Sequence, residues 1–293
     1  MVDFPRHALV RSLLDLLRVS LLKKVGILYQ PKLAAAGALA QELASFLPSL
    51  EASVWLCSAW EEGKAKAQVE GTELILSVGG DGTILRAARA AVPWSVPIVG
   101  VNLGRLGFMT ELSADEVQQR LPAFLAGEGW IDERTMLQVE VAGKDLTFHA
   151  LNDVVVGRGA ISRVVYVAII IDGAPLATYK ADGLLLATAT GSTGYSLAAG
   201  GPILYPQAKE IILSPLFPHL TFANALVFPS TAIVELTVGT DHQAMLSIDG
   251  QINIELENGD SIRVMLSPHV TRFLRARPQN FFYSSLMERL GQR

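Results

Sequence analysis

The sequence has one cysteine, Cys57, and lacks the commonest nucleotide-binding signatures. A single thiol excludes an internal disulfide framework and a Cys-based metal site, so we expect a reducing, cytoplasmic setting. Neither the phosphate-loop pattern GxxxxGKS/T nor GxGxxG occurs, so the sequence does not support the commonest nucleotide folds. The five histidines are dispersed and show no metal-ligand spacing, so no metal-binding residue is assigned. His219, between Pro218 and Leu220, is expected to be a packed histidine.

Basic clusters and long apolar runs are also missing. Only 18% of residues are charged, the net charge is −4 and the pI is about 5.8. Because the basic residues are scattered, a nucleic acid or a membrane surface is not an expected partner. Asp15 and Arg18 interrupt the apolar segment 13–22, which we interpret as a short amphipathic helix or arm. Residues 183–208 are too rich in Gly, Thr, Ser and Pro to span a bilayer, so a soluble chain is expected.

The chain is rich in apolar residues, which make up half of its 293 positions. That length suits one large or two ordinary domains with a sizeable core. The apolar surplus also makes buried subunit interfaces plausible.

The most informative stretch is Leu74–Thr83, in which an apolar run leads into three glycines around Asp81. This pattern predicts a strand, a tight turn and a helix from Ile84 onward. Glycines let the backbone approach a ligand, and the free N–H groups of a helix start favour phosphate. Asp81 would repel phosphate unless it holds a metal ion or takes a proton. The alternative is that Asp81 is an ordinary helix N-cap.

Alternating strands and helices in the first part of the chain predict an α/β domain with a parallel, Rossmann-like sheet. Ligands of such sheets bind beyond the carboxyl ends of the strands, where Gly82 and Asn102 would lie. Ser113 and Glu116 form a capping-box pattern at the start of another helix. The expected strands are 23–29, 54–56, 74–78 and 98–101, and the expected first helix is 33–47.

From Trp130 onward the sequence predicts a mostly-β domain, because short β-rich runs alternate with turn signals. We place the domain boundary near residue 125, giving domains 1–125 and 126–270. A C-terminal segment, 271–293, is expected to be helical from 280 and to return to the first domain. The expected strands are 137–141, 153–156, 164–171, 183–187, 233–238, 245–248, 252–256 and 261–266, with turns at Asp172-Gly173, Asp249-Gly250 and 258–260.

A hydroxyl-rich segment, 188–196, follows the strand that Lys180-Ala181-Asp182-Gly183 introduces. Its hydroxyls, glycines and Tyr195 suit the phosphates and riboses of a dinucleotide. Asn152-Asp153 can read an adenine edge or ribose hydroxyls. Each motif also has a plain structural interpretation, as a solvated loop or a turn.

Taken together and in this order, the motifs resemble those of the NAD kinase family, from about Val25 to Tyr283. The resemblance rests on 79–83, on 102–108, on Asn152-Asp153, on Asp182 to Pro202, and on 249–251. It implies an α/β domain plus a β-rich domain, assembled as a homodimer or homotetramer. It also implies phosphorylation of the adenosine-ribose 2′-hydroxyl of NAD by ATP or polyphosphate, with Mg²⁺ or another divalent cation.

The resemblance implies a role for each matching residue. Asp81 would be the catalytic aspartate, with Gly82 beside it at the substrate. Asn152 and Asp153 would hold adenosine and ribose groups, and Asp182 the nicotinamide half or a ribose. The remaining implied contacts to the dinucleotide are Arg86, Arg163, Lys180, Thr193, Gly194, Tyr195, Ser196 and Gln251.

Several positions depart from the family pattern. Asp153 stands where Glu is more usual, Ala189 where Pro is common, and Gly194 where Ala is common. Asn224-Ala225 occupies the place of an expected Arg-Pro, which puts an interface or phosphate role there in doubt.

A phosphotransferase is the favoured interpretation, since a carboxylate at Asp81 can take the proton of a ribose hydroxyl. A lipid or diacylglycerol-type kinase also has a GGDGT loop, but it would not explain the segment 191–201. A non-catalytic dinucleotide-binding regulator would bind NAD without consuming ATP.

Overall fold

The computed structural model describes residues 24–104, 107–159, 163–219 and 222–291. The chain divides into two compact units, one of residues 1–87, 96–131 and 274–293, the other of 88–95 and 132–273. The expected arm at 13–22 and two positions of the 102–108 motif lie outside the described residues. No helix in the described ranges is long and apolar enough to cross a membrane.

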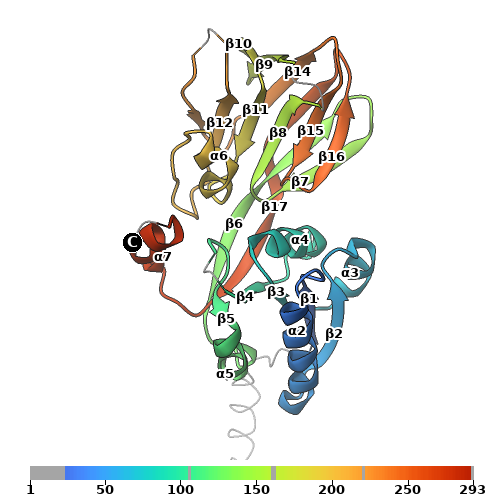
Figure 1. Cartoon of the computed structure of the whole chain (residues 1–293), viewed down its shortest axis with the longest axis vertical. Helices are drawn as coiled ribbons and strands as arrows, with labels where there is room; N and C mark the ends of the chain where they lie inside the picture. Colours follow the sequence, from blue (N-terminus) through green and yellow to red (C-terminus); the bar gives the residue numbers. More distant parts are fainter. Residues whose placement is uncertain (1–23, 105–106, 160–162, 220–221, 292–293) are drawn as a thin grey trace, which may run out of the picture. The chain divides into compact units, whose positions relative to one another are not determined.

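The first unit holds a parallel sheet with strand order β2-β1-β3-β4 and a short β5 beside β4. Helix α2 packs on β1 and β2, and α3 on β2 (Figure 1). The α/β prediction is confirmed. The strands are β1 (Lys24–Tyr29), β2 (Ser53–Ser58), β3 (Leu74–Val78), β4 (Ile98–Asn102) and β5 (Leu112–Ser113), and the helices α2 (Ala34–Phe46), η1 (Leu47–Leu50), α3 (Glu62–Val69), α5 (Ala114–Leu125) and α7 (Phe281–Arg289), with α4 (Asp81–Ala91) beginning here.

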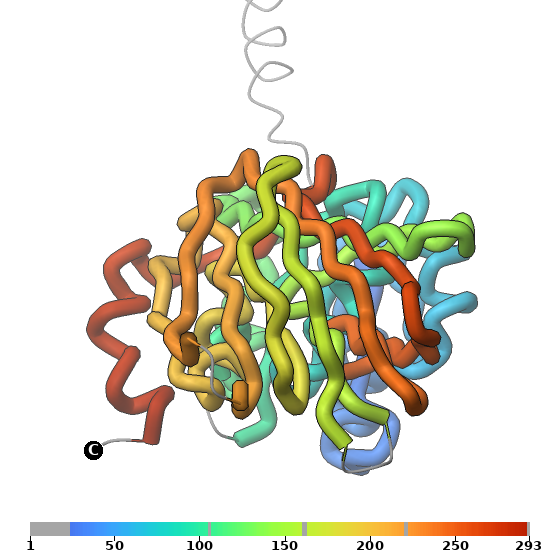
Figure 2. The backbone as a smooth tube through the Cα atoms, turned by 90° about the horizontal axis from the view of Figure 1, so that it is seen from above, coloured from blue at the N-terminus to red at the C-terminus, as the bar shows by residue number. Residues whose placement is uncertain are grey.

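The second unit is a β-sandwich, because side chains of two antiparallel sheets share one buried core. One sheet has the order β10-β9-β14-β17, with the hairpin β6-β7 attached to β17, and the other the order β13-β12-β11-β8-β15-β16 (Figure 2). The mostly-β prediction is confirmed. The strands are β6 (Trp130–Val141), β7 (Leu146–Ala150), β8 (Asp153–Arg158), β9 (Val165–Ile171), β10 (Ala174–Ala181), β11 (Gly183–Ala187), β12 (Ile211–Leu216), β13 (Leu226–Phe228), β14 (Val234–Gly239), β15 (Ala244–Ile248), β16 (Ile252–Leu256) and β17 (Ser261–Arg275), with η2 (Gly191–Thr193) and α6 (Tyr195–Ala198).

Several boundaries differ from the expected ones. Helix α4 begins at Asp81 and not at Ile84, because the carbonyl of Gly80 already accepts the N–H of Thr83 at 2.9 Å. Strand β17 continues nine residues beyond the expected end at 266. The expected turns are present: Asp172 and Asp249 have positive φ, and a positive-φ glycine follows each.

Candidate active site

In the first unit, Asp81 opens α4 directly after β3. Gly79 is required there, because its φ is +153° and a Cβ would lie 2.4 Å from Thr83 Oγ1. An added Cβ at Gly80 or Gly82 would meet no atom of the described residues within 4 Å. The turn therefore requires glycine at position 79, whereas Gly80 and Gly82 have free space beside them among the described residues.

The carboxylate of Asp81 joins two glycine motifs that lie apart in the sequence, 79–83 and 102–108. Asp81 Oδ2 accepts the N–H of Phe108 at 2.9 Å, and Oδ1 accepts that of Met109 at 3.1 Å. A Cβ on Gly107 would lie 2.3 Å from Asp81 Oδ1, so only glycine permits this approach. The two backbone donors fix the orientation of the carboxylate.

A buried ion pair supports the segment that binds Asp81. Glu111, 3% exposed, accepts Arg275 Nη1 at 3.3 Å and the N–H groups of Ala276 and Arg277 at 2.9 and 2.8 Å. Arg275 Nη1 also donates to the carbonyl of Met109 at 2.9 Å. The backbone that donates to Asp81 is thus held by the last residues of β17 and those after them.

Arg86 lies on the same helix as Asp81 and one turn further along. Its guanidinium sits 4.2 Å from the centre of the Trp60 ring, a cation–π distance. This contact places Arg86 in the first unit, and its expected contact to a dinucleotide stays a prediction.

In the second unit, Asn152 and Asp153 lie at the start of β8 and are tied to Asp249. The Asp249 carboxylate accepts the N–H groups of Leu151, Asn152 and Asp153 at 3.0, 2.7 and 3.1 Å. The N–H of Asp249 in turn donates to the carbonyl of Asp153 at 2.9 Å. This reciprocal bonding locks the Asn-Asp pair against the turn after β15.

The buried carboxylates of Asp153 and Asp249 both have raised pKa values. Burial and then the charge of Asp249 raise the pKa of Asp153 to about 7. Burial also raises the pKa of Asp249, opposed by its three backbone donors and by Arg89. Asp153 is therefore poised to exchange a proton near neutral pH.

The hydroxyl-rich segment folds as η2 and α6 and packs on Asn152. A Cβ on Gly191 would lie 2.0 Å from the carbonyl oxygen of Asn152, so a glycine is required. Some of its hydroxyls stabilise the segment itself: Thr188 Oγ1 donates to the carbonyl of Leu151 at 2.6 Å and Ser192 Oγ to that of Ala189 at 2.6 Å. These two hydroxyls are thus structural.

Other polar atoms of this corner have no hydrogen-bond partner in the described residues. They are Asn152 Oδ1 and Ser196 Oγ, both fully buried. A Cβ added at Gly194 would lie 3.7 Å from Asn152 Nδ2 and 4.0 Å from Asp153 Oδ2, while Tyr195 is 48% exposed. Buried polar atoms normally have partners, so these two need an ordered water or a ligand to satisfy them.

Gln251 follows the Asp249-Gly250 turn in this unit. Its Oε1 accepts Arg89 Nη1 at 3.2 Å, and Arg89 also lies near the Asp249 carboxylate. The structure thus brings Asn152, Asp153, Gly194 and Gln251 to one end of the six-stranded sheet.

Asp182 lies at the opposite end of that sheet. The register pairs Ala187 of β11 with Asp153 and Gly183 with Gly157, so Asp182 adjoins the far end of β8. There its carboxylate pairs with Arg158 at 3.4 Å. Within one unit, the structure does not bring Asp182 to Asn152 and Asp153.

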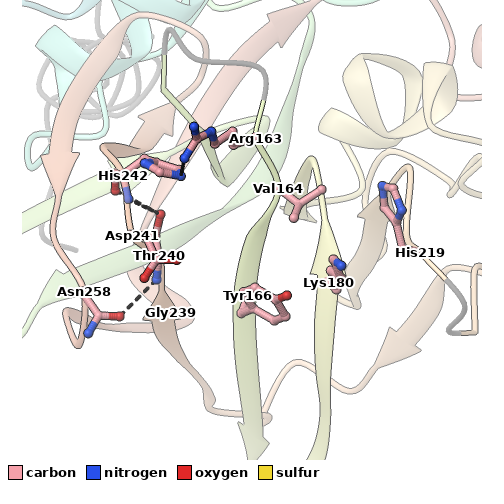
Figure 3. A pocket seen from close by; sticks show the side chains of 10 residues that line it. All are labelled: Arg163, Val164, Tyr166, Lys180, His219, Gly239, Thr240, Asp241, His242 and Asn258. Atoms are coloured by element: carbon pink, nitrogen blue, oxygen red, sulfur yellow. Dashed lines mark hydrogen bonds between the residues drawn. The ribbon is translucent and has the colours of Figure 1, made fainter.

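Arg163 and Lys180 line a separate hollow of about 600 Å³ in the second unit (Figure 3). Arg163 Nη1 donates to His242 Nε2 at 2.7 Å, and the Lys180 ammonium lies 5.8 Å from the centre of the Tyr166 ring. His219 is exposed and also lines this hollow, so its prediction as a packed histidine is wrong. A turn after β12, with Phe217 at positive φ, presents it outward.

Several residues that shape these corners have no role predicted from the sequence. Asp249 was expected at a turn and in the 249–251 motif, but not as the anchor of the Asn152-Asp153 pair. Glu111 and Arg275 were not singled out because 164 residues separate the partners. Asp132 and Arg134, two apart on one strand, would have been detectable as a charged pair on one face.

No group of three or more His, Cys, Asp or Glu residues is arranged for a metal ion in the described parts of the chain. Asp81 is a single carboxylate, which fits an ion carried mainly by substrate phosphates and water.

Comparison with known proteins gives one consistent result. The family profile described as "ATP-NAD kinase N-terminal domain" matches residues 10–129, and that described as "ATP-NAD kinase C-terminal domain" matches 151–276. An NAD kinase of Dehalococcoides mccartyi is 49% identical over 272 residues, covering 92% of this chain and 96% of the relative. One from Chloroflexus aurantiacus is 41% identical, covering 92% and 99%.

Two solved structures are similar in fold. Yeast NADH kinase complexed with NADH has a TM-score of 0.81 and 26% identity, covering 92% of this chain and 88% of that one. An NAD kinase from Archaeoglobus fulgidus in complex with ATP has a TM-score of 0.73 and 25% identity, covering 92% and 98%.

Proposed function

The chain belongs to the NAD kinase family, and from this premise we propose how its residues divide the reaction between them. It is a phosphotransferase with an alcohol acceptor, which transfers the terminal phosphoryl group of ATP to the adenosine-ribose 2′-hydroxyl of NAD. Neither a lipid kinase nor a non-catalytic regulator finds support among the related proteins.

Asp81 is proposed as the catalytic residue. The observation that carries this role is the carboxylate at the open side of a glycine turn, aligned by two backbone N–H groups. A ribose hydroxyl is a weak nucleophile at neutral pH, so a positioned carboxylate that accepts its proton helps by about 10²–10⁴-fold. Phosphoryl transfer otherwise depends mainly on positioning and charge stabilisation.

Recognition of NAD is assigned to the second unit. Asn152 offers an unpaired amide oxygen to the adenosine half, and Asp153 can accept from a ribose hydroxyl when ionised. Thr193, Gly194, Tyr195 and Ser196 line the same corner, with Gln251 behind the Asp249 turn. Gly82 and Arg86 remain proposed contacts on the side of the first unit.

A homodimer or homotetramer is proposed to complete the site. Asp182 and the hollow with Arg163 and Lys180 lie away from Asn152 and Asp153 in a single unit. Contacts from a second subunit would let both groups of residues serve one dinucleotide. Mixing an Asp81→Asn protein with an Asp182→Ala protein tests this. If each subunit supplies only one part, the mixture recovers activity that neither variant has alone.

Mg²⁺ is the proposed ion, and the cytoplasm the proposed location. When bound, the ion offsets the negative charge of the donor phosphates. Asp81 is the carboxylate of the turn that would face it.

The test of the proposed function is direct. We expect purified protein with NAD, ATP and Mg²⁺ to form NADP, detected with an NADP-specific dehydrogenase. Replacing ATP by inorganic polyphosphate, or NAD by NADH, defines the donor and the acceptor. Absence of NADP with every donor, together with phosphorylation of a lipid in vesicles, would overturn the proposal.

A further inference from the structure

A buried ion pair lies under the hydroxyl-rich segment, outside all the roles assigned so far. Asp132 and Arg134 are two residues apart on β6, and they are 3% and 6% exposed. Arg134 Nε donates to both Asp132 oxygens at 2.9 Å, and Nη2 donates to Oδ2 at 2.6 Å. The guanidinium also lies 5.6 Å from the centre of the Phe273 ring.

Stability alone is a weak reason to keep such a pair. Taking two charges out of water is costly, and well-packed apolar residues of similar volume often stabilise a core equally well. A functional reason for the pair is therefore more informative, and it lies in the other hydrogen bonds that Asp132 and Arg134 make.

Those remaining atoms hold both ends of the segment that carries the proposed NAD contacts. Arg134 Nη1 donates to Thr190 Oγ1 at 3.3 Å, just before η2. Gln207 Nε2 donates to Asp132 Oδ1 at 3.3 Å on the other side of the segment. Residues 193–196 lie between these two attachment points.

A second bond carries the constraint from Thr190 to a proposed ligand contact. Thr193 Oγ1 donates to the carbonyl oxygen of Thr190 at 3.2 Å. A displaced Thr190 would thus move the Thr193 hydroxyl and the start of α6 together.

We propose that Arg134 is a positioning residue for NAD, which acts through Thr190 to hold residues 193–196 in their binding arrangement, with Asp132 orienting its guanidinium. The proposal rests on the assignment of that segment to NAD. Arg suits the task because its planar fork can bind a carboxylate with two donors and still offer a third to a hydroxyl. Lysine has the charge but not the fork.

The experiment measures KM and kcat for NAD in Arg134→Lys and Thr190→Val proteins. We expect KM for NAD to rise about tenfold or more in each, because each loses a charge-assisted hydrogen bond, with kcat and KM for ATP changed less than threefold. The double variant should be no worse than the worse single one, since both remove one interaction. Arg272→Ala is the matched control, because it breaks an exposed pair between Arg272 of β17 and Glu133, which lies between Asp132 and Arg134 on β6.

A variant that keeps the fold guards against simple unfolding. Asp132→Leu with Arg134→Met removes the charges as a pair and should keep the melting temperature near that of the wild type, while KM for NAD still rises. Unchanged KM for NAD in both Arg134→Lys and the Leu/Met protein would overturn the proposal. Tyr195→Ala distinguishes failure of the positioning role of Arg134 from failure of the proposed function of the segment. If this variant also leaves KM for NAD unchanged, residues 193–196 are wrongly assigned to NAD.

Discussion

Each of the two units contains a turn in which a glycine has no room for a side chain, because an added Cβ would clash with a polar group. The polar group differs between the two turns. In the first unit, Gly107 packs on the Asp81 carboxylate, whose oxygens already accept two backbone N–H groups. In the second, Gly191 packs on the carbonyl of Asn152, whose side-chain oxygen has no partner in the described residues. The first turn fixes the proposed catalytic carboxylate, and the second leaves a side-chain oxygen of the proposed NAD site without a partner in the described residues.

Both turns also rest on a buried arginine–carboxylate pair. Glu111 and Arg275 support the first, and Asp132 and Arg134 support the second. The proposed roles assign chemistry to the first turn and recognition to the second. Changes at the first turn should therefore lower kcat, and changes at the second should raise KM for NAD.

The largest expected effect is on kcat, and it comes from a substitution in the first turn alone. Asp81→Asn should lower kcat by about 10²–10⁴-fold, because the amide cannot accept the proton of the ribose hydroxyl. The Kd for NAD, measured by calorimetry, should stay within about threefold of the wild type. Asp115→Asn is the control, because Asp115 is likewise an aspartate near the N-terminal end of a helix, α5, but it is exposed. Wild-type turnover in the Asp81 variant would remove Asp81 from catalysis.

Adding one methyl group to each turn sharpens the contrast. Gly107→Ala forces its methyl against Asp81, and Gly191→Ala forces its methyl against the Asn152 carbonyl. We expect each to destabilise the fold by about 1–3 kcal/mol through overpacking. Steady-state kinetics should show a lower kcat for the first and a higher KM for NAD for the second. Gly63→Ala, where an added Cβ meets no described atom within 4 Å, is the control, and reversed kinetic effects would contradict the division.

Asn152→Leu probes the unpaired oxygen of the second turn. We expect KM for NAD to rise about tenfold, since a hydrogen bond to the ligand is lost. Thermal unfolding of the free protein should show no loss of stability, because Asn152 Oδ1 has no partner to lose among the described residues. A large fall in melting temperature with unchanged KM would instead make Asn152 a structural residue.

The last prediction concerns stability and not activity, as a pH dependence that arises from Asp153 at the second turn. The folded pKa of Asp153, about 7, lies above its ordinary 3.8, so the folded state holds a proton that the unfolded chain releases. Stability should therefore fall as pH rises from about 4 to 7, by at most about 4 kcal/mol from this group. Asp153→Asn should reduce that slope in denaturant unfolding at several pH values. An identical slope in both proteins would show that Asp153 does not titrate in this range.

The sequence predicts best where local patterns decide structure. The β3–turn–α4 unit, the capping box of Ser113 with Glu116 and the Asp-Gly turns are found as expected, because each depends on neighbouring residues. Glu116 accepts the N–H and the hydroxyl of Ser113, both at 2.9 Å.

Elements that depend on distant partners were missed. Strand β10 is mostly exposed and contains Pro175, and β12 contains Pro215, so neither shows a clear strand pattern. Pro215 is tolerated because it pairs with β11 beyond the end of the β13 pairing. In the same way, the motifs indicated the residues of the site, but only the folded sheet shows that Asp182 and Asp153 lie at opposite ends of β8.

One contact of the last helix has a practical consequence for work with this enzyme. Arg289 of α7 donates to the carbonyl of Phe108 at 3.0 Å, and the N–H of Phe108 is a donor to Asp81. Deleting α7 together with Arg289 would thus remove a donor from the residue that aligns the aspartate. A preparation truncated before Arg289 should be treated as an altered catalyst until its turnover has been compared with that of the unmodified chain.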